Sequence, residues 1–181
     1  LLSNPDILVN LSDIRSVDEY TFSHCVNVCV LSVLTGAAME YSRDELRTLG
    51  MGAILHDIGK TMIPKEILNK PGRLTKEEYE IIKKHPQFGY EILEEYPNIN
   101  DLIRLVVLTH HERFDGKGYP FGWEGETIHE FSRIVSIADV YDAMTSERAY
   151  SKKNMPHKAM EYLLSMGNHQ FDYEITKIFI R

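Results

Sequence analysis

The chain alternates between segments whose apolar residues recur every three or four positions and segments rich in glycine, proline and charge. The first kind of segment has the period of an α-helix with one buried face. Seven such segments predict helices at about 17–40, 43–57, 76–95, 99–112, 128–146, 156–166 and 172–181. No segment alternates with a period of two. The pattern therefore predicts an all-α fold, a compact bundle of about seven helices without a substantial sheet.

Local signals support several of these helix boundaries. A serine or threonine followed three residues later by glutamate forms a capping box, in which each side chain satisfies a backbone N–H of the other. Four such pairs occur, at Ser16 and Glu19, Ser42 and Glu45, Thr75 and Glu78, and Thr127 and Glu130. The helix over 76–95 is expected to break near Pro86, because the residue before a proline disfavours the α conformation.

Two connections are longer than the two to eight residues that usually join helices in a bundle. They span 59–75 and 114–127. The second holds four aromatic residues, which argues against disorder: Phe114, Tyr119, Phe121 and Trp123. Its glycines and proline are typical of turns. The same loop could instead line a pocket, approach a substrate or contact a partner domain.

Length and composition favour one domain over 1–181, with residues 1–16 as a possible linker from an upstream region. The net charge of −7 argues against general nucleic-acid binding. An anionic small molecule remains a suitable substrate if positive charge or a metal ion is supplied locally. The chain starts without methionine, and we expect it to be a piece of a longer protein.

The cellular setting is predicted from cysteines and hydropathy. No apolar stretch reaches the roughly 18 residues of a membrane span, and no signal peptide is recognisable. Cys25 and Cys29 lie four apart on one predicted helix without further thiols for a zinc site. We interpret them as free thiols of a reducing compartment, which predicts a cytoplasmic protein.

Polar residues interrupt the apolar faces or follow the ends of five predicted helices. They are His24, His56, Asp57, His85, His110, His111 and Asp139. A single buried histidine is usually a hydrogen-bonded core residue, but an ionised buried aspartate must be paired or bound to a cation. Asp139 and Asp142, three apart on one helix face, would repel each other without one. Such groups from facing helices converge in a bundle core, which predicts a metal centre there.

The number and type of these groups indicate the chemistry. Five imidazoles and two carboxylates exceed the needs of one ion and suit two. A nitrogen and oxygen set without thiolate favours iron or manganese, with nickel or zinc as alternatives. Two ions about 3.5–4 Å apart hold a bridging hydroxide and bind a phosphoryl group, which predicts phosphoester hydrolysis. No Walker loop and no serine or cysteine nucleophile with a clear partner competes.

Four motifs in order resemble the HD-GYP family of the HD phosphohydrolase superfamily, over about 18–180. They are "HDIGK", "LNKPGRLTKEEYEIIKKHP", "HHERFDGKGYP" and "ADVYDAMTSERAY". The resemblance implies an all-α bundle with two or three metal ions. It also implies hydrolysis of the bacterial second messenger cyclic di-GMP to linear pGpG, to GMP, or to both.

The resemblance further implies roles for individual residues. One ion would be held by His24, His56, Asp57 and Asp139, and the other by Asp57, His85, His110 and His111. Lys60 would face the substrate phosphate and the bridging solvent, unless it satisfies helix carbonyls. The expected substrate contacts are Lys60, Asp142, Arg148, Gly118, Tyr119 and Pro120. Guanine stacking could use Tyr119, Phe121 or Trp123.

Two positions depart from the family pattern. Members with a third ion carry a glutamate four residues before the first histidine, and Tyr20 stands there in this chain. We therefore expect two ions. The basic residue that often follows the tyrosine of "ERAY" is replaced by Ser151, with Lys152 and Lys153 next. Arg148 could pair with an acidic neighbour instead of substrate.

Three functions stay open from the sequence. The first is a cyclic di-GMP phosphodiesterase, controlled by an upstream sensor or receiver domain and possibly dimeric. The second is a phosphohydrolase for cyclic GMP-AMP or other nucleotides, and the third is a catalytically silent module that binds a nucleotide or a partner. His129, His157 and His169 are interpreted as surface or capping residues. Lys83 and Lys84 are interpreted as a solvated face that could also add local positive potential over an acidic protein.

Overall fold

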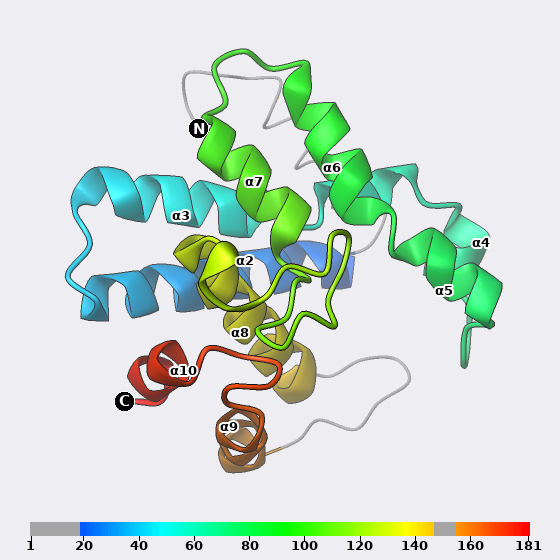
Figure 1. Cartoon of the computed structure of the whole chain (residues 1–181). Helices are drawn as coiled ribbons and strands as arrows, with labels where there is room; N and C mark the ends of the chain where they lie inside the picture. The colour runs from blue at the N-terminus through cyan, green and yellow to red at the C-terminus, as the bar shows by residue number, and fades with distance from the viewer. Residues whose placement is uncertain (1–18, 147–154) are drawn as a thin grey trace.

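A computed structural model describes residues 19–146 and 155–181, with side chains from residue 22 (Figure 1). The elements in chain order are α2 (Glu19–Ala38), α3 (Arg43–Leu55), the 3-10 helix η1 (Ile58–Met62), α4 (Lys65–Leu68), α5 (Lys76–Ile82), α6 (His85–Glu94), α7 (Asp101–Thr109), the 3-10 helix η2 (Gly125–Thr127), α8 (Glu130–Thr145), α9 (Pro156–Ser165) and α10 (Tyr173–Ile180). Helices α2 and α3 lie side by side and run in opposite directions, and α8 crosses beneath α2 (Figure 1).

The all-α prediction is confirmed. Over the described ranges β-pairing is limited to two isolated bridges, one of which joins Asp115 and Glu124. The region 76–95 divides into α5 and α6, but the break lies at 83–84 rather than near Pro86. Pro86 stands in the first turn of α6, where its missing N–H removes no helical hydrogen bond. The connection 59–75 contains η1 and α4, which the apolar pattern did not predict.

Helix capping follows the sequence signals in part. The boxes at Ser42 and Thr75 are both formed with the glutamate three residues later. The box predicted at Thr127 is wrong, because α8 begins at Glu130 and His129 is its N-cap. The His129 ring accepts a hydrogen bond from the Phe131 N–H at 3.1 Å, so the prediction of a capping role for this histidine is confirmed. The box at Ser16 lies outside the described residues.

Two apolar clusters hold the described helices together. The larger lies among α2, α3, α7, α8, α9 and α10, with Leu49, Ala53 and Val106 among its buried members. The smaller lies among α3, η1, α6 and α7 and includes Leu55 and Val107. Helices α3 and α7 therefore contribute to both clusters. Burial on both sides fixes the ends of these helices, which carry the predicted ligand pairs.

The η1 segment packs against α6 without a side chain between the two backbones. A Cβ atom at Gly59 would lie 1.9 Å from the carbonyl oxygen of His85 and 2.4 Å from the amide nitrogen of Gly89. This contact brings Asp57, immediately before η1, next to His85 at the start of α6. Among the described helices, none is long and apolar enough to cross a membrane.

Candidate metal centre

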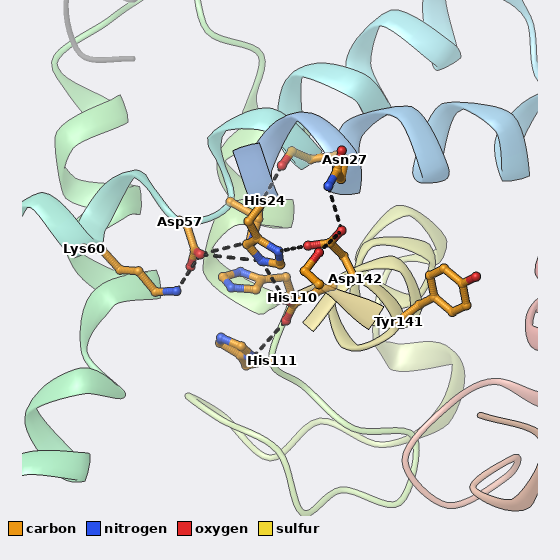
Figure 2. Close-up of polar contacts among 12 residues, drawn as sticks. His24, Asn27, Asp57, Lys60, His110, His111, Tyr141 and Asp142 are labelled. Atoms are coloured by element: carbon orange, nitrogen blue, oxygen red, sulfur yellow. Dashed lines mark hydrogen bonds and ion pairs between the residues drawn. The ribbon is translucent and has the colours of Figure 1, made fainter. Parts of the chain in front are cut away.

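The structure brings the seven predicted ligands into one cluster (Figure 2). The ligand atoms form two groups, and within each group all atoms lie within 4.8 Å of one another. One group consists of His24, His56 and Asp57, and the other of Asp57, His85, His110 and His111. Asp57 belongs to both groups. Asp139 on α8 joins them, with its carboxylate 3.0 Å from His24 Nε2 and 4.0 Å from His111 Nδ1.

Three of the histidines are oriented by the last carbonyls of the helices that precede them. Each Nδ1–H donates to the carbonyl oxygen three residues earlier, because a carbonyl can only accept. The distances are 2.7 Å from His56 to Ala53, 2.7 Å from His85 to Ile82 and 2.8 Å from His110 to Val107. These bonds fix the tautomer and leave the Nε2 lone pairs for the centre of the cluster.

His24 is oriented by a carboxylate instead. Its Nδ1–H donates to Asp142 at 2.6 Å, and Asp142 also accepts from Asn27 at 2.8 Å and Ser146 at 2.9 Å (Figure 2). The Asp142 side chain is buried and both of its oxygens are engaged. This geometry gives Asp142 the role of orienting His24, and the predicted substrate contact at Asp142 stays a prediction. A carboxylate behind a ligating histidine orients the ring and raises its basicity.

Burial keeps three imidazoles uncharged. It lowers the pKa of His85 to about 3 and that of His111 to about 4, and it holds the pKa of His110 well below its ordinary value. Burial would also lower the pKa of His24, but hydrogen bonds with two carboxylates outweigh it and raise the pKa to about 9. His85, His110 and His111 are therefore in the form that binds a cation at neutral pH.

The two carboxylates are held in the ionised form. Burial would raise the pKa of Asp57, but Lys60 and His56 outweigh it and hold the pKa well below its usual range. Burial acts on Asp139 in the same direction, and the hydrogen bond from His24 overcomes it and lowers the pKa. Ionised carboxylates beside uncharged imidazoles are the donor set of a divalent cation.

Two features of the nitrogens show that the cluster fits metal ions. The Nε2 atom of His56 is buried and has no hydrogen-bond partner among the described residues. The Nε2 atoms of His85 and His110 lie 3.3 Å apart, although both carry their proton on Nδ1 and so face each other with lone pairs. Two nitrogen ligands at right angles about 2.1 Å from an ion are roughly 3 Å apart. A cation between these rings removes the repulsion.

Lys60 lies at the same centre. Its ammonium group donates to Asp57 Oδ2 at 2.5 Å, while the side chain remains 25% exposed (Figure 2). Burial would lower the pKa of Lys60, but the Asp57 carboxylate outweighs it and raises the pKa. The structure thus places the charge of Lys60 at the ligand cluster rather than on helix carbonyls.

A cavity of about 380 Å³ opens over His111 and Asp139. Three cationic residues line it, namely Lys83 at the end of α5 and Arg113 and Lys117 in the loop after His111. The chain as a whole carries −7, so this local gathering of positive charge is favourable for an anionic ligand. Lys83 is partly buried and lines the cavity, in agreement with the alternative that this pair adds local positive potential, whereas Lys84 is exposed and does not line it.

The glycine-rich loop folds back over His111. The Tyr119 N–H donates to the His111 carbonyl at 3.2 Å, and the two rings lie 4.8 Å apart. A Cβ atom at Gly118 would lie 2.6 Å from the same carbonyl oxygen, so the loop can approach only as glycine. Gly118 and Tyr119 line the cavity as predicted for substrate contacts. Pro120 lines a different cavity of about 300 Å³, and its contact with a substrate stays a prediction.

Glu112 is the residue that holds this loop, and sequence reasoning missed it. The side chain is 2% exposed, and its oxygens accept from the backbone N–H groups of Phe121 at 2.7 Å and Trp123 at 3.0 Å. An acid directly after two adjacent histidines, followed by a long loop, was the available signal. Glu112 joins the predicted ligand pair to the loop as one rigid unit.

The candidates for base stacking differ in their positions. Phe121 and Trp123 stack on each other at 4.9 Å, and neither lines the cavity over His111. Tyr119 does line it, and so does the exposed Tyr79, which the sequence did not indicate.

Several predictions fall partly or wholly outside the described residues. These are the contacts at Arg148 and at 151–153, and the expectation of two ions that rests on the side chain of Tyr20. They stay predictions. Both cysteines are free thiols, with Cys25 buried and Cys29 partly buried. His157 and His169 are exposed, as predicted.

Comparison with known proteins agrees with the geometry. The family described as "HD domain" matches residues 17–175. The cyclic di-GMP phosphodiesterase PA4108 of Pseudomonas aeruginosa is 38% identical over 181 residues, covering 100% of this chain and 44% of the relative. The cyclic di-GMP phosphodiesterase response regulator RpfG of Xanthomonas campestris pv. campestris is 40% identical over 149 residues, covering 82% and 39%. The 3'3'-cGAMP-specific phosphodiesterase 2 of Vibrio cholerae is 28% identical over 180 residues, covering 98% and 34%.

A solved structure shares the fold. Bd1817, an HDG"Y"P protein from Bdellovibrio bacteriovorus, aligns with a TM-score of 0.71 at 21% identity, covering 86% of this chain and 50% of the other. The chain spans less than half the length of the curated relatives described above.

Proposed function

Because the chain belongs to the HD domain family, we propose that it is a metal-dependent phosphodiesterase that hydrolyses cyclic di-GMP to linear pGpG, to GMP, or to both. The observation that carries the proposal is the position of Asp57. Its carboxylate belongs to two groups of ligand atoms and contacts Lys60 near a cavity lined by cations. Relatives named cyclic di-GMP phosphodiesterases support the choice of substrate.

The two groups suggest how two ions are held. One would be bound by His24, His56, Asp57 and Asp139, and the other by Asp57, His85, His110 and His111. Nitrogen and carboxylate ligands without thiolate favour iron or manganese, with nickel or zinc as alternatives. When bound, two such ions lower the pKa of a water molecule and withdraw charge from a phosphate group.

The residues of the chain supply orientation and charge for an in-line attack on one phosphodiester. Helix carbonyls hold His56, His85 and His110, so the donor atoms do not reorganise during the reaction. Lys60 adds positive charge beside Asp57, where negative charge develops on the phosphoryl oxygens. Tyr119 and the loop that Glu112 folds cover His111 and limit the access of solvent.

A comparison of substrates tests the proposed function. The protein, loaded with iron or manganese under anaerobic conditions, is incubated with cyclic di-GMP, cyclic GMP-AMP and mononucleotides, and the products are separated by chromatography. We expect cyclic di-GMP to be consumed in a metal-dependent way, with mononucleotides unchanged. Binding without turnover in every metal would overturn the proposal in favour of a silent module, which the complete ligand set disfavours. Preference for cyclic GMP-AMP is the second candidate, and the Vibrio cholerae relative favours it.

Lys60→Ala is expected to lower turnover by about 10²-fold, the usual effect of removing one group that stabilises developing charge. The metal content should stay unchanged, because the lysine contacts Asp57 without belonging to either ligand group. Lys65→Ala, at an exposed position of α4, is the matched control. Initial rates and metal analysis of the three proteins provide the measurement. Turnover equal to that of the control would contradict the role of Lys60.

The length of the relatives leaves room for other parts in the complete protein. We propose that an additional sensor or receiver domain controls this domain, that the assembly is a dimer, and that it works in the cytoplasm. The shares of 44% and 39% that the chain covers in its relatives support a longer protein, and the free cysteines support a reducing compartment.

A further inference from the structure

The substrate of the proposed function carries more charge than the ion cluster can neutralise. A cyclic dinucleotide contains two phosphodiesters on opposite sides of its ring, and only one can be attacked at a time. The second stays ionised, and a phosphate that leaves water without a cationic partner loses much of its solvation energy. The cavity should therefore hold a cation at a distance from Lys60.

The three cations that line the cavity are not equally available. The Arg113 guanidinium donates two hydrogen bonds to the Asp115 carboxylate, at 2.9 and 2.8 Å, so its charge is already paired. Lys117 is exposed in the glycine-rich loop, and only its backbone N–H is tied down, by Asp115 at 3.2 Å. Lys83 at the end of α5 is the partly buried lysine of the three, and aromatic rings lie next to its ammonium group.

Lys83 is held in position without being neutralised by a buried partner. Its ammonium lies 5.8 Å from the ring centre of Tyr79 and 5.5 Å from that of Tyr119, within the range of a cation–π contact. It also pairs with Glu80 at 2.9 Å, but that carboxylate is 64% exposed. Ion pairs of this kind are weak, so a phosphate can replace Glu80 at little cost.

The position of Lys83 relative to the ion cluster completes the argument. The Tyr119 ring lies 4.8 Å from the His111 ring and also contacts Lys83, so a single aromatic ring separates the cation from a predicted metal ligand. Resting on the proposed function, we propose that Lys83 binds the second, non-reacting phosphate of a dinucleotide substrate. The subsite is the cavity of about 380 Å³ that Lys83 and Tyr119 line.

The experiment compares Lys83→Ala with Lys84→Ala in the metal-loaded protein. Lys84 is the adjacent, exposed lysine and does not line the cavity. For cyclic di-GMP, Lys83→Ala should raise KM at least about tenfold, the effect of losing one hydrogen bond to a charged group. For bis(p-nitrophenyl) phosphate, which has one phosphodiester, the same variant should change KM by less than about twofold, since no second phosphate is present. Lys83→Arg should recover most of the lost affinity.

A binding measurement decides the inference independently of turnover. The affinity for linear pGpG, which also carries two phosphates, is measured by calorimetry for the wild-type protein, Lys83→Ala and Lys84→Ala. A loss confined to Lys83→Ala, with unchanged metal content and melting temperature, supports the subsite. Equal affinities, an equal loss for both variants, or no binding by the wild type would overturn it. Failure of the proposed function has a different signature, namely hydrolysis of bis(p-nitrophenyl) phosphate but not of cyclic di-GMP.

Discussion

Asp57→Asn is expected to remove both metal ions and to lower turnover by about 10⁴-fold, equivalent to roughly 5.5 kcal/mol of transition-state stabilisation. Asp57 is the residue shared by the two ligand groups, and its side chain is almost fully buried. Asparagine preserves the shape but carries no charge and offers a single oxygen. Of the two carboxylates in the cluster, Asp139 alone would then remain to balance two cations among five histidines. Metal analysis after gel filtration and initial rates with cyclic di-GMP provide the measurement.

His56→Ala is the informative comparison. His56 belongs to only one of the two groups, so this variant should keep the ion held by His85, His110 and His111. We expect about half of the metal content of the wild type. If Asp57→Asn also retained half of its metal, the two ions would be held independently and Asp57 would not bridge them.

Gly59→Ala is expected to prevent folding or to lower the free energy of unfolding by more than about 4 kcal/mol. The new Cβ would lie 1.9 Å from the His85 carbonyl and 2.4 Å from the Gly89 nitrogen, and both are backbone atoms that no rotamer change can move. Relief requires η1 and α6 to separate, which would also pull Asp57 away from His85. Denaturant unfolding followed by circular dichroism measures the effect.

Gly50→Ala in α3 is the matched control. Its Cβ would meet only the ends of side chains, at 3.0 Å from Val33 and 3.5 Å from Cys29. Alanine also gains about 1 kcal/mol of helix propensity over glycine, which offsets the crowding. The free energy of unfolding should change by less than about 1 kcal/mol. Equal losses for both variants would show that the contact of η1 with α6 is not special.

The helices were predictable because their signals are local. The capping boxes at Ser42 and Thr75 and the apolar periodicity depend on residues within one or two turns, and the structure follows both. The break before α6 was misplaced for the opposite reason. A proline is compatible with a helix start as well as with a helix end, and only the packing of His85 against η1 decides between them.

The site was predictable as a set of residues but not as a geometry. Acids and histidines on apolar helix faces can be recognised in the sequence because burying them without a bound cation raises the free energy of the folded state. Asp142 acts through His24, which is far away in the sequence, and Glu112 acts through backbone N–H groups. Neither kind of partner can be recognised from the order of side-chain types. The sequence could not decide which of Lys83 and Lys84 adds charge to the site, because only the fold determines that Lys83 lines the cavity and Lys84 does not.

The bonds that orient His56, His85 and His110 have an electrostatic consequence. In each bond the histidine Nδ1–H donates to a carbonyl oxygen among the last residues of a helix, so the carboxyl ends of α3, α5 and α7 meet at one place. A helix carries about half a negative charge at that end. Three such ends attract cations and repel a phosphodiester before any side chain is counted. We therefore expect metal ions to bind before an anionic ligand does.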